Sequence, residues 1–150
     1  MTRRLRAPVR SERGSAIAEM AVIAPLLLLL LIGVVEVGRY AHYSILVAGA
    51  ARAGVQYGSQ NLVTAADLAG MQTAALNDGQ NDVSLRSTAS QFCKCADGTA
   101  STCLPTDCSA SHRLVYVQVD AFGTFQSLLH YPGIRGAQAL TTRAIMRVAE

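Results

Sequence analysis

The stretch SAIAEMAVIAPLLLLLLIGVV, residues 15–35, decides how this chain is built. It contains one charged side chain, Glu19, among otherwise apolar or small residues. As an α-helix it would be about 30 Å long, which matches the hydrocarbon thickness of a bilayer. The sequence therefore predicts a membrane-spanning helix close to the N-terminus.

The charges on either side of this stretch predict its orientation. Arginines are concentrated before the apolar run, and Glu36 and Arg39 follow it. Because positively charged flanks stay in the cytoplasm, we expect a cytoplasmic N-terminus and an exported remainder. An ordinary signal anchor and a cleaved secretory signal share this orientation.

The composition of the whole chain excludes some classes of protein. Of the 150 residues, 51% are hydrophobic and 15% are charged, which is too apolar for a disordered chain. The formal net charge of +3 comes from the residues before position 14, so no basic patch covers the rest of the chain. We therefore expect no nucleic-acid partner.

The residues around Glu19 carry a resemblance. Glu19 is the fifth residue after Gly14, and Gly14 directly follows the basic stretch. This order, in which Arg-Gly is followed by four residues, a Glu and a long apolar helix, resembles that of a type IV prepilin. The resemblance implies that a prepilin peptidase cuts after Gly14, so that Ser15 becomes the N-terminus and its amine pairs with the Glu19 carboxylate. From the residues alone, Glu19 is also near enough to the cytoplasmic edge to reach water or Arg13.

Residues 13–39 point to a particular family among the type IV prepilins. The chain is similar there to the TadE-like family, the minor pilins or pseudopilins of bacterial tight-adherence (Tad, Flp) pilus systems. Met20 departs from the pattern, because Phe or Tyr is expected after the Glu. Pro25, inside the helix, removes one backbone hydrogen bond and bends the axis. The similarity is carried by Arg13, Gly14, Glu19, Ala21, Pro25, the Leu run 26–31, Gly33, Glu36 and Arg39.

The resemblance to TadE-like proteins also implies a function and a location. The protein would take part in assembling a tight-adherence pilus. It would not be an enzyme and would need no cofactor. Its partners would be the prepilin peptidase, other pilin or pseudopilin subunits, the inner-membrane assembly platform and the lipid bilayer. It would cross the bacterial inner membrane once, with its C-terminal domain in the periplasm or, within a pilus, outside the cell. The alternative is a signal-anchored membrane protein with a periplasmic binding domain and no fibre.

The pattern along the chain predicts an α+β, pilin-like fold. We expect a basic leader at 1–14, an N-terminal helix at 15–60 that spans the membrane in its first half, and an exported domain at 61–150. Small residues at Ala50, Gly54 and Gly58 let another element approach that helix closely. The spacing of Thr64 and Asp67 predicts the start of a second helix.

Three alternating segments predict a short antiparallel sheet laid against the helices. The first is short and centres on Val83 and Leu85, and the other two are longer. The apolar connection 122–134 between the second and third strands is either a surface for a partner or a loop folded over the core. In the longer strands, one face is formed by Val115, Val117, Val119 and Ala121, and by Leu140, Thr142, Ala144, Met146 and Val148.

Four cysteines lie within a polar loop, residues 93–108. Their spacing does not match the paired C-x-x-C of structural zinc sites, so we expect no metal there. An oxidising compartment favours two disulfides, and a bridge between Cys93 and Cys95 would be strained. Two pairings remain: Cys93–Cys108 with Cys95–Cys103, or Cys93–Cys103 with Cys95–Cys108.

The sequence contains no recognisable catalytic or nucleotide-binding motif. His112 lies near Asp107 and Ser111, but neighbours in a polar loop do not make a catalytic triad. The stretch Asn77–Asp82 is rich in oxygen ligands without the spacing of a calcium-binding loop, and we expect a turn there.

Overall fold

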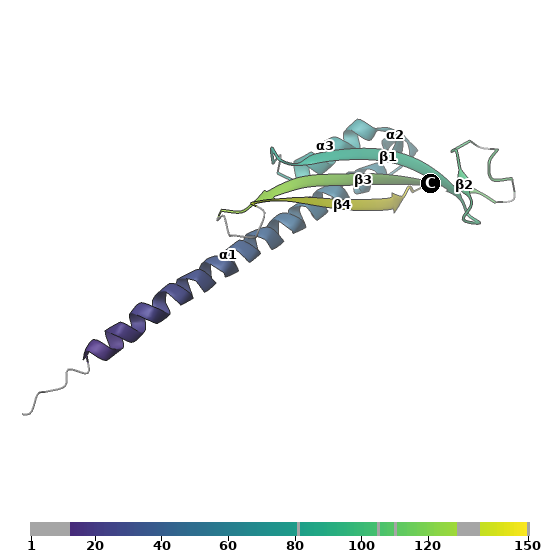
Figure 1. The fold of residues 1–150 in the computed structure, drawn as a ribbon. Helices are drawn as coiled ribbons and strands as arrows, with labels where there is room; N and C mark the ends of the chain where they lie inside the picture. Colours follow the sequence, from purple (N-terminus) through teal and green to yellow (C-terminus); the bar gives the residue numbers. More distant parts are fainter. Residues whose placement is uncertain (1–12, 81, 105, 110, 129–135, 150) are drawn as a thin grey trace, which may run out of the picture. The chain divides into compact units, whose positions relative to one another are not determined.

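The computed structural model describes residues 13–80, 82–104, 106–109, 111–128 and 136–149 (Figure 1). Three helices come first and four strands follow, which confirms the α+β class. The chain divides into two compact units, Met1–Gly38 and Arg39–Glu150, each described by itself. The elements are α1 (Arg13–Gly58), α2 (Leu62–Ala66), α3 (Leu68–Asp78), β1 (Arg86–Cys95), β2 (Ala100–Ser101), β3 (Arg113–Gln126) and β4 (Ala137–Arg147).

The part of α1 within the second unit packs through small residues. Ala50 is fully buried, and Gly54 and Gly58 are buried on the same side of the helix. A Cβ atom added to Gly54 would lie 2.9 Å from the carbonyl oxygen of Met71 and 3.0 Å from the Val119 Cγ2. Glycine at this position therefore allows α1 to approach both α3 and β3, as the sequence predicted.

Two short helices follow α1, and their start differs from the prediction. Asn61 caps α2: its side-chain oxygen accepts hydrogen bonds from the backbone N–H groups of Val63 and Thr64, both at 2.9 Å. The Thr64 hydroxyl accepts from the backbone N–H of Asn61. The predicted second helix is confirmed as α3, but its cap is Asp67, and Thr64 lies within the separate helix α2. Asp67 ends α2 and caps α3 through the N–H of Gly70, at 2.8 Å.

The strands form one antiparallel sheet in the order β2-β1-β3-β4. The long strand β3 is central, because Val119 pairs with Ala89 of β1 and with Ala144 of β4. Residues paired directly across strands point to the same face of a sheet. Val115, Val117, Val119 and Ala121 therefore share one face with Ala144 and Met146, which confirms the faces predicted for the two longer strands.

The first strand lies later in the chain than the sequence suggested. Val83 is 89% exposed and lies in a turn, where the N–H of Ser84 donates to the Asp82 carboxylate at 2.7 Å. Leu85 is buried, but β1 begins only at Arg86. The strand was missed because most of β1 is polar, with few of the branched residues that mark strands.

The buried side chains lie between the helices and one face of the sheet. One cluster joins Val55 of α1 and Met71 of α3 to Val117 and Val119 of β3. A second joins Val47, Ala50 and Ala51 of α1 to Leu85 and Ala121. Burying a valine completely contributes about 1.5–3 kcal/mol, so β3 stabilises this unit strongly. In Figure 1 the strands of the sheet lie across α1 and α3, which together cover its inner face.

Residues 148 and 149 close the domain. The N–H of Val148 donates to the carbonyl of Val115, and the N–H of Ala149 donates to the carbonyl of Ser59, both at 2.9 Å. Val148 is only 2% exposed and belongs to the core. Residues just beyond β4 are thus fastened to the loop that follows α1.

Candidate functional site

The first unit exposes an apolar helix. The large apolar side chains from Ile17 to Val37 are exposed, from 38% at Ile32 to 76% at Val22. A helix that is apolar on all sides is not suited to water, and the stretch from Ala16 is long enough to cross a bilayer. The described part of the chain therefore contains one candidate membrane-spanning helix, which is consistent with a single-pass membrane protein.

The predicted processing residues lie at the start of this helix. α1 begins at Arg13, so Gly14 and Ser15 are in its first turn and Glu19 is about one turn further on. The helix continues through Pro25 and past Gly33 and Glu36. An added Cβ at Gly33 would meet nothing within 4 Å. Residues 1–12, which include most of the predicted leader, lie outside the described residues.

Arg39 belongs to the second unit and lies beside an aromatic cluster. Its guanidinium carbon is 5.4 Å from the centroid of the Phe125 ring, a cation–π distance. The Tyr40 ring meets Phe125 edge-on at 5.5 Å between centroids, and the Tyr43 ring lies 6.1 Å away. The Tyr43 hydroxyl is hydrogen-bonded to the Ser84 hydroxyl.

The sequence analysis did not find this aromatic cluster. Arg39, Tyr40 and Tyr43 are spaced to share one side of a helix, which is a visible signal. Their partner Phe125 was placed in a connection, whereas β3 continues to Gln126. That part of the prediction for 122–134 was wrong. Phe125 is 7% exposed and covers the core, while Leu128 is 67% exposed, and residues 129–134 lie outside the described residues.

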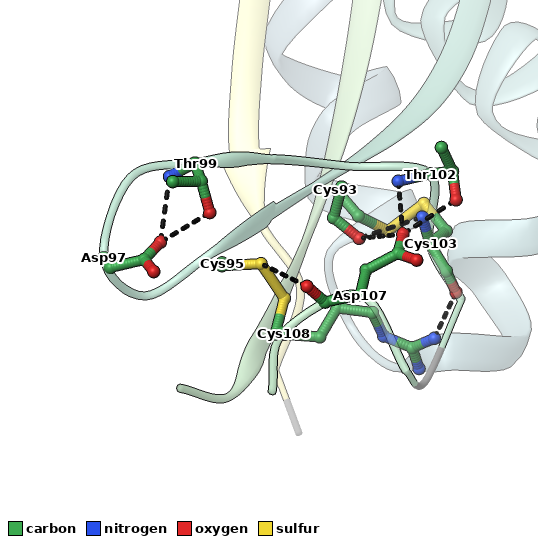
Figure 2. Close-up of a disulfide and its surroundings, with 10 residues drawn as sticks. Cys93, Cys95, Asp97, Thr99, Thr102, Cys103, Asp107 and Cys108 are labelled. Carbon is green, nitrogen blue, oxygen red and sulfur yellow. Dashed lines mark hydrogen bonds between the residues drawn. A yellow bond between two sulfur atoms is a disulfide. The ribbon is translucent and has the colours of Figure 1, made fainter. Parts of the chain in front are cut away.

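The four cysteines form two disulfides, in one of the two pairings that the sequence left open. Cys93 is bonded to Cys103, and Cys95 is bonded to Cys108 (Figure 2). Cys93 and Cys95 are not in the loop but on β1, where both are buried. The bridges therefore fasten residues 103 and 108 to the sheet.

Carboxylates order the segment between the disulfides. The Asp107 carboxylate accepts hydrogen bonds from the Thr102 N–H at 2.6 Å, the Thr102 hydroxyl at 2.7 Å and the Ser101 hydroxyl at 3.0 Å. These bonds, the Thr102 hydroxyl first, lower the pKa of Asp107. Asp97 accepts from the N–H and the hydroxyl of Thr99 (Figure 2).

The turn between β1 and β2 requires glycine. Gly98 has a φ of 89°, which lies in the left-handed region that side chains disfavour. Its N–H donates to the carbonyl of Cys95 at 2.9 Å, which closes the turn. The result is a cross-linked tip whose polar groups bind one another.

Nothing in the described ranges brings reactive groups together. His112 is exposed and lies outside any group of residues suited to a metal ion, since the described residues contain no cluster of three or more His, Cys, Asp or Glu. Asp78 and Asp82 flank a turn, as expected for this stretch, and Asn81 lies outside the described residues. The residues that stand out chemically are thus those of the apolar helix.

A protein-family model described as TadE-like protein matches residues 14–56. The match covers less than a third of the chain, begins at Gly14 and includes Glu19, Pro25 and Arg39. The predicted resemblance to the TadE-like family is confirmed over this segment, and it supports a pilin-like protein associated with a Tad pilus. Neither the curated proteins nor the solved structures contain a significant match to this chain.

Proposed function

From the TadE-like segment at residues 14–56, we propose that the protein is a minor pilin or pseudopilin that is cut after Gly14 and takes part in assembling a tight-adherence pilus. The observation that carries the proposal is the register of Gly14 and Glu19 at the head of an apolar helix. In this role the protein acts through contacts between subunits and has no catalytic activity of its own.

The position of Gly14 suits cleavage. It lies in the first turn of α1, where backbone N–H groups have no partner within the helix. Glycine is also about 1 kcal/mol less favourable than alanine inside a helix, so this turn opens at low cost. A peptidase that binds an extended backbone reaches the bond between Gly14 and Ser15 more easily there than further along α1.

Glu19 supplies a charge for assembly. A carboxylate within an apolar helix costs a few kcal/mol in a bilayer unless it is paired. Cleavage creates an amine at Ser15, about one turn of helix away from Glu19. In a low-dielectric environment an opposite charge stabilises this carboxylate, so the amine of a neighbouring subunit or of the same chain binds Glu19.

The proposed location follows from the same helix. The basic residues before position 14 hold the N-terminus in the cytoplasm, and the second unit lies in the periplasm. Tyr40 and Tyr43 lie just beyond the apolar run, where tyrosines commonly mark the membrane–water interface. The partners are the prepilin peptidase, other pilin or pseudopilin subunits and the assembly platform in the inner membrane.

The test is the N-terminal sequence and intact mass of the protein extracted from native membranes. We expect a chain that starts at Ser15. Gly14→Ile places a branched side chain beside the cut bond and blocks maturation, whereas Gly33→Ile makes the same change later in α1 and leaves it intact. Glu19→Gln is processed but fails to assemble, and Glu36→Gln is its matched control.

The outcomes separate the two functions considered for this chain. A chain that keeps Met1 or Thr2, with a silent Glu19→Gln variant, identifies a signal-anchored membrane protein with a periplasmic binding domain. A chain that starts beyond Arg39 identifies a secreted domain. Normal processing and assembly of Gly14→Ile also contradicts the proposal.

A further inference from the structure

The sheet of the second unit has one face that no described element covers (Figure 1). We call it the outer sheet face. Because alternate residues of a strand point to opposite faces, it carries the even-numbered residues of β1 and β3 and the odd-numbered residues of β4. Its charged residues are Arg86, Lys94, Asp120, Arg143 and Arg147.

The outer sheet face is basic. It has four cations and one carboxylate, and the carboxylate of Asp120 is bound to Arg143, with 2.6 Å between its Oδ1 and the Arg143 Nε. Arg86, Lys94 and Arg147 are exposed. The Arg86 guanidinium donates to the carbonyls of Val83 and Leu85, whereas its positive charge has no carboxylate beside it among the interactions described. Within residues 39–150 this is a local excess, because the acidic residues of that unit lie mostly elsewhere.

Apolar groups accompany these cations on the outer sheet face. The rings of Phe92 and Tyr116 stack with 5.3 Å between centroids and 10° between planes. Ile145 is 48% exposed, and Tyr116 pairs across the ladder with Arg147. Aromatic and arginine side chains together are typical of the buried centres of protein interfaces.

The other side of the same unit has the complementary character. We give the name α2–α3 surface to the outward side of the two short helices and the turn after them. It is defined by the exposed residues Val63, Asp67, Asp78 and Val83 and by Asp82, which is half-buried. Residues 53–85 contain these three aspartates and no lysine or arginine. Val63 is 80% exposed and Val83 is 89% exposed, so apolar groups accompany the aspartates on this surface.

Among the described residues, the two surfaces adjoin at Arg86, whose Nη1 donates to the carbonyl of Val83 at 2.8 Å, and the core separates the rest of them. Met71 and Ala75 of α3 pack in the core with Val117 and Val119, which point to the inner face of the sheet. Apart from the contact between Arg86 and Val83, the outer sheet face and the α2–α3 surface thus lie on opposite sides of one domain. When two unlike surfaces of a protomer bind each other, each added copy presents the next free surface, which gives a closed ring or an open array according to the rotation between copies.

We propose that the outer sheet face of one copy binds the α2–α3 surface of a second copy, with the cations of the sheet beside the three aspartates. The inference rests on the proposed function, because it adds a contact between exported domains to the contact between apolar helices. Surface charges attract within about 10 Å at ordinary salt, so the interaction weakens as salt is raised.

Lys94 makes this contact measurable. It is the single lysine of the chain, so the amide bonds formed after a carbodiimide activates carboxylates can involve only the amines of Lys94 and the N-terminus. Full-length protein in native membranes is treated, and the linked peptides are identified by mass spectrometry. We expect covalent dimers that join Lys94 to Asp67, Asp78 or Asp82. Lys94→Arg keeps the cation, removes the amine and abolishes these dimers.

A charge reversal tests the surface independently of the reagent. Arg147→Glu lies at the rim of the outer sheet face and should lower the dimer yield about fivefold, the effect of roughly 1 kcal/mol. Arg52→Glu makes the same change on α1, outside both surfaces, and should leave the yield unchanged. Intact disulfides in a non-reducing gel show that each variant has folded.

Several results would overturn the contact. One is that an amine-specific label modifies Lys94, which shows that it is accessible, while no crosslink forms. Another is that Lys94 is linked only to a different protein. An unchanged dimer yield with Arg147→Glu also counts against the contact. So does a result in which only anionic vesicles suppress the labelling of Lys94 by the amine-specific reagent. The N-terminus is sequenced in the same sample. A chain that starts at Ser15 without the dimers contradicts this contact alone, whereas dimers from a chain that keeps Met1 contradict the proposed maturation alone.

Discussion

At the scale of single residues, the glycines of α1 have different roles. Gly54 and Gly58 face α3 and β3, and a methyl group at either position collides with neighbouring atoms. Gly33 and Gly38 have nothing within 4 Å of an added Cβ. Glycine is therefore required by packing in the part of α1 that belongs to the domain, while any requirement at Gly33 must come from neighbouring molecules.

Gly54→Val should destabilise the second unit. The new side chain meets the Met71 carbonyl and Val119, and overpacking of this kind costs about 1–3 kcal/mol. Thermal unfolding of the full chain in detergent should shift down by about 4–8 °C for each kcal/mol. Gly38→Ala, which has open space around it, serves as the control. Equal midpoints for the Gly54→Val variant and the native protein would refute the close approach.

Asp120 gives the stability of the sheet a predictable acid dependence. The hydrogen bond from Arg143, with a further one from Gln118, lowers the pKa of the Asp120 carboxyl. A group with a lowered pKa in the folded state contributes stability above its unfolded pKa of about 3.9 and loses it as pH falls through the folded value. We expect Asp120→Asn to flatten the decline of the melting midpoint between about pH 4 and pH 2.

A second variant checks the cause of this acid dependence. Arg143→Gln removes the partner that lowers the pKa of Asp120 most, so it should flatten the same part of the curve while leaving the carboxylate in place. Curves of unchanged slope in both variants would show that other carboxylates dominate.

At the scale of elements, the disulfides determine how the tip of the domain is held. Both bridges begin on β1, and they bring the segment from Cys103 to Cys108 back to the sheet. The strand β2 is only two residues long and pairs with Cys93 and Lys94. Because β2 is so short, its hydrogen bonds to β1 add little stability. The disulfides therefore hold this edge of the sheet in place.

Removing the longer bridge should therefore cost stability. Cys95→Ser with Cys108→Ser opens a loop with a sequence separation of 13, which corresponds to about 3 kcal/mol. Unfolding by urea, followed in the full chain, measures the loss. The variant should still form the Cys93–Cys103 bridge, and an unaltered midpoint would mean that the hydrogen bonds to Asp107 hold the tip without it.

Elements were predictable from the sequence where their pattern is local. The alternation in β3 and β4 identified both strands and their faces, and the apolar run identified α1. β1 was missed because its buried side chains include Cys93 and Cys95, which were interpreted as loop residues. The cap at Asn61 was missed because its capping box ends in Thr64 rather than in the expected Glu or Gln.

The sequence was enough to name the residues of the candidate site, but it did not predict which residues they contact. Gly14, Glu19 and Arg39 follow from their spacing along one helix, which needs no tertiary information. The packing of Arg39, Tyr40 and Tyr43 on Phe125 joins residues more than eighty positions apart, and only the sheet register brings them together. The disulfide pairing likewise depended on where β1 ends.

At the scale of the whole molecule, the charge asymmetry predicts one orientation. Gln56 is exposed on α1 within the second unit, and no described cysteine is free, so an introduced thiol reacts alone. A membrane-impermeant maleimide should label Gln56→Cys in intact spheroplasts. Thr2→Cys, tested in the uncleaved Gly14→Ile protein, should be labelled only after lysis. The reverse pattern would contradict the proposed topology.

The fastening of the C-terminus has a consequence for how the protein is made. Val148 fills the core and Ala149 binds Ser59, so the second unit is incomplete until residues 148 and 149 have been synthesised. At about 5–20 residues per second, the chain between those contacts takes roughly 5–18 s to make. During that interval the core faces of α1 and β3 lack the contact that Val148 supplies. A chain interrupted before residue 148 would therefore carry the complete apolar part of α1 together with a second unit that lacks its last core contact.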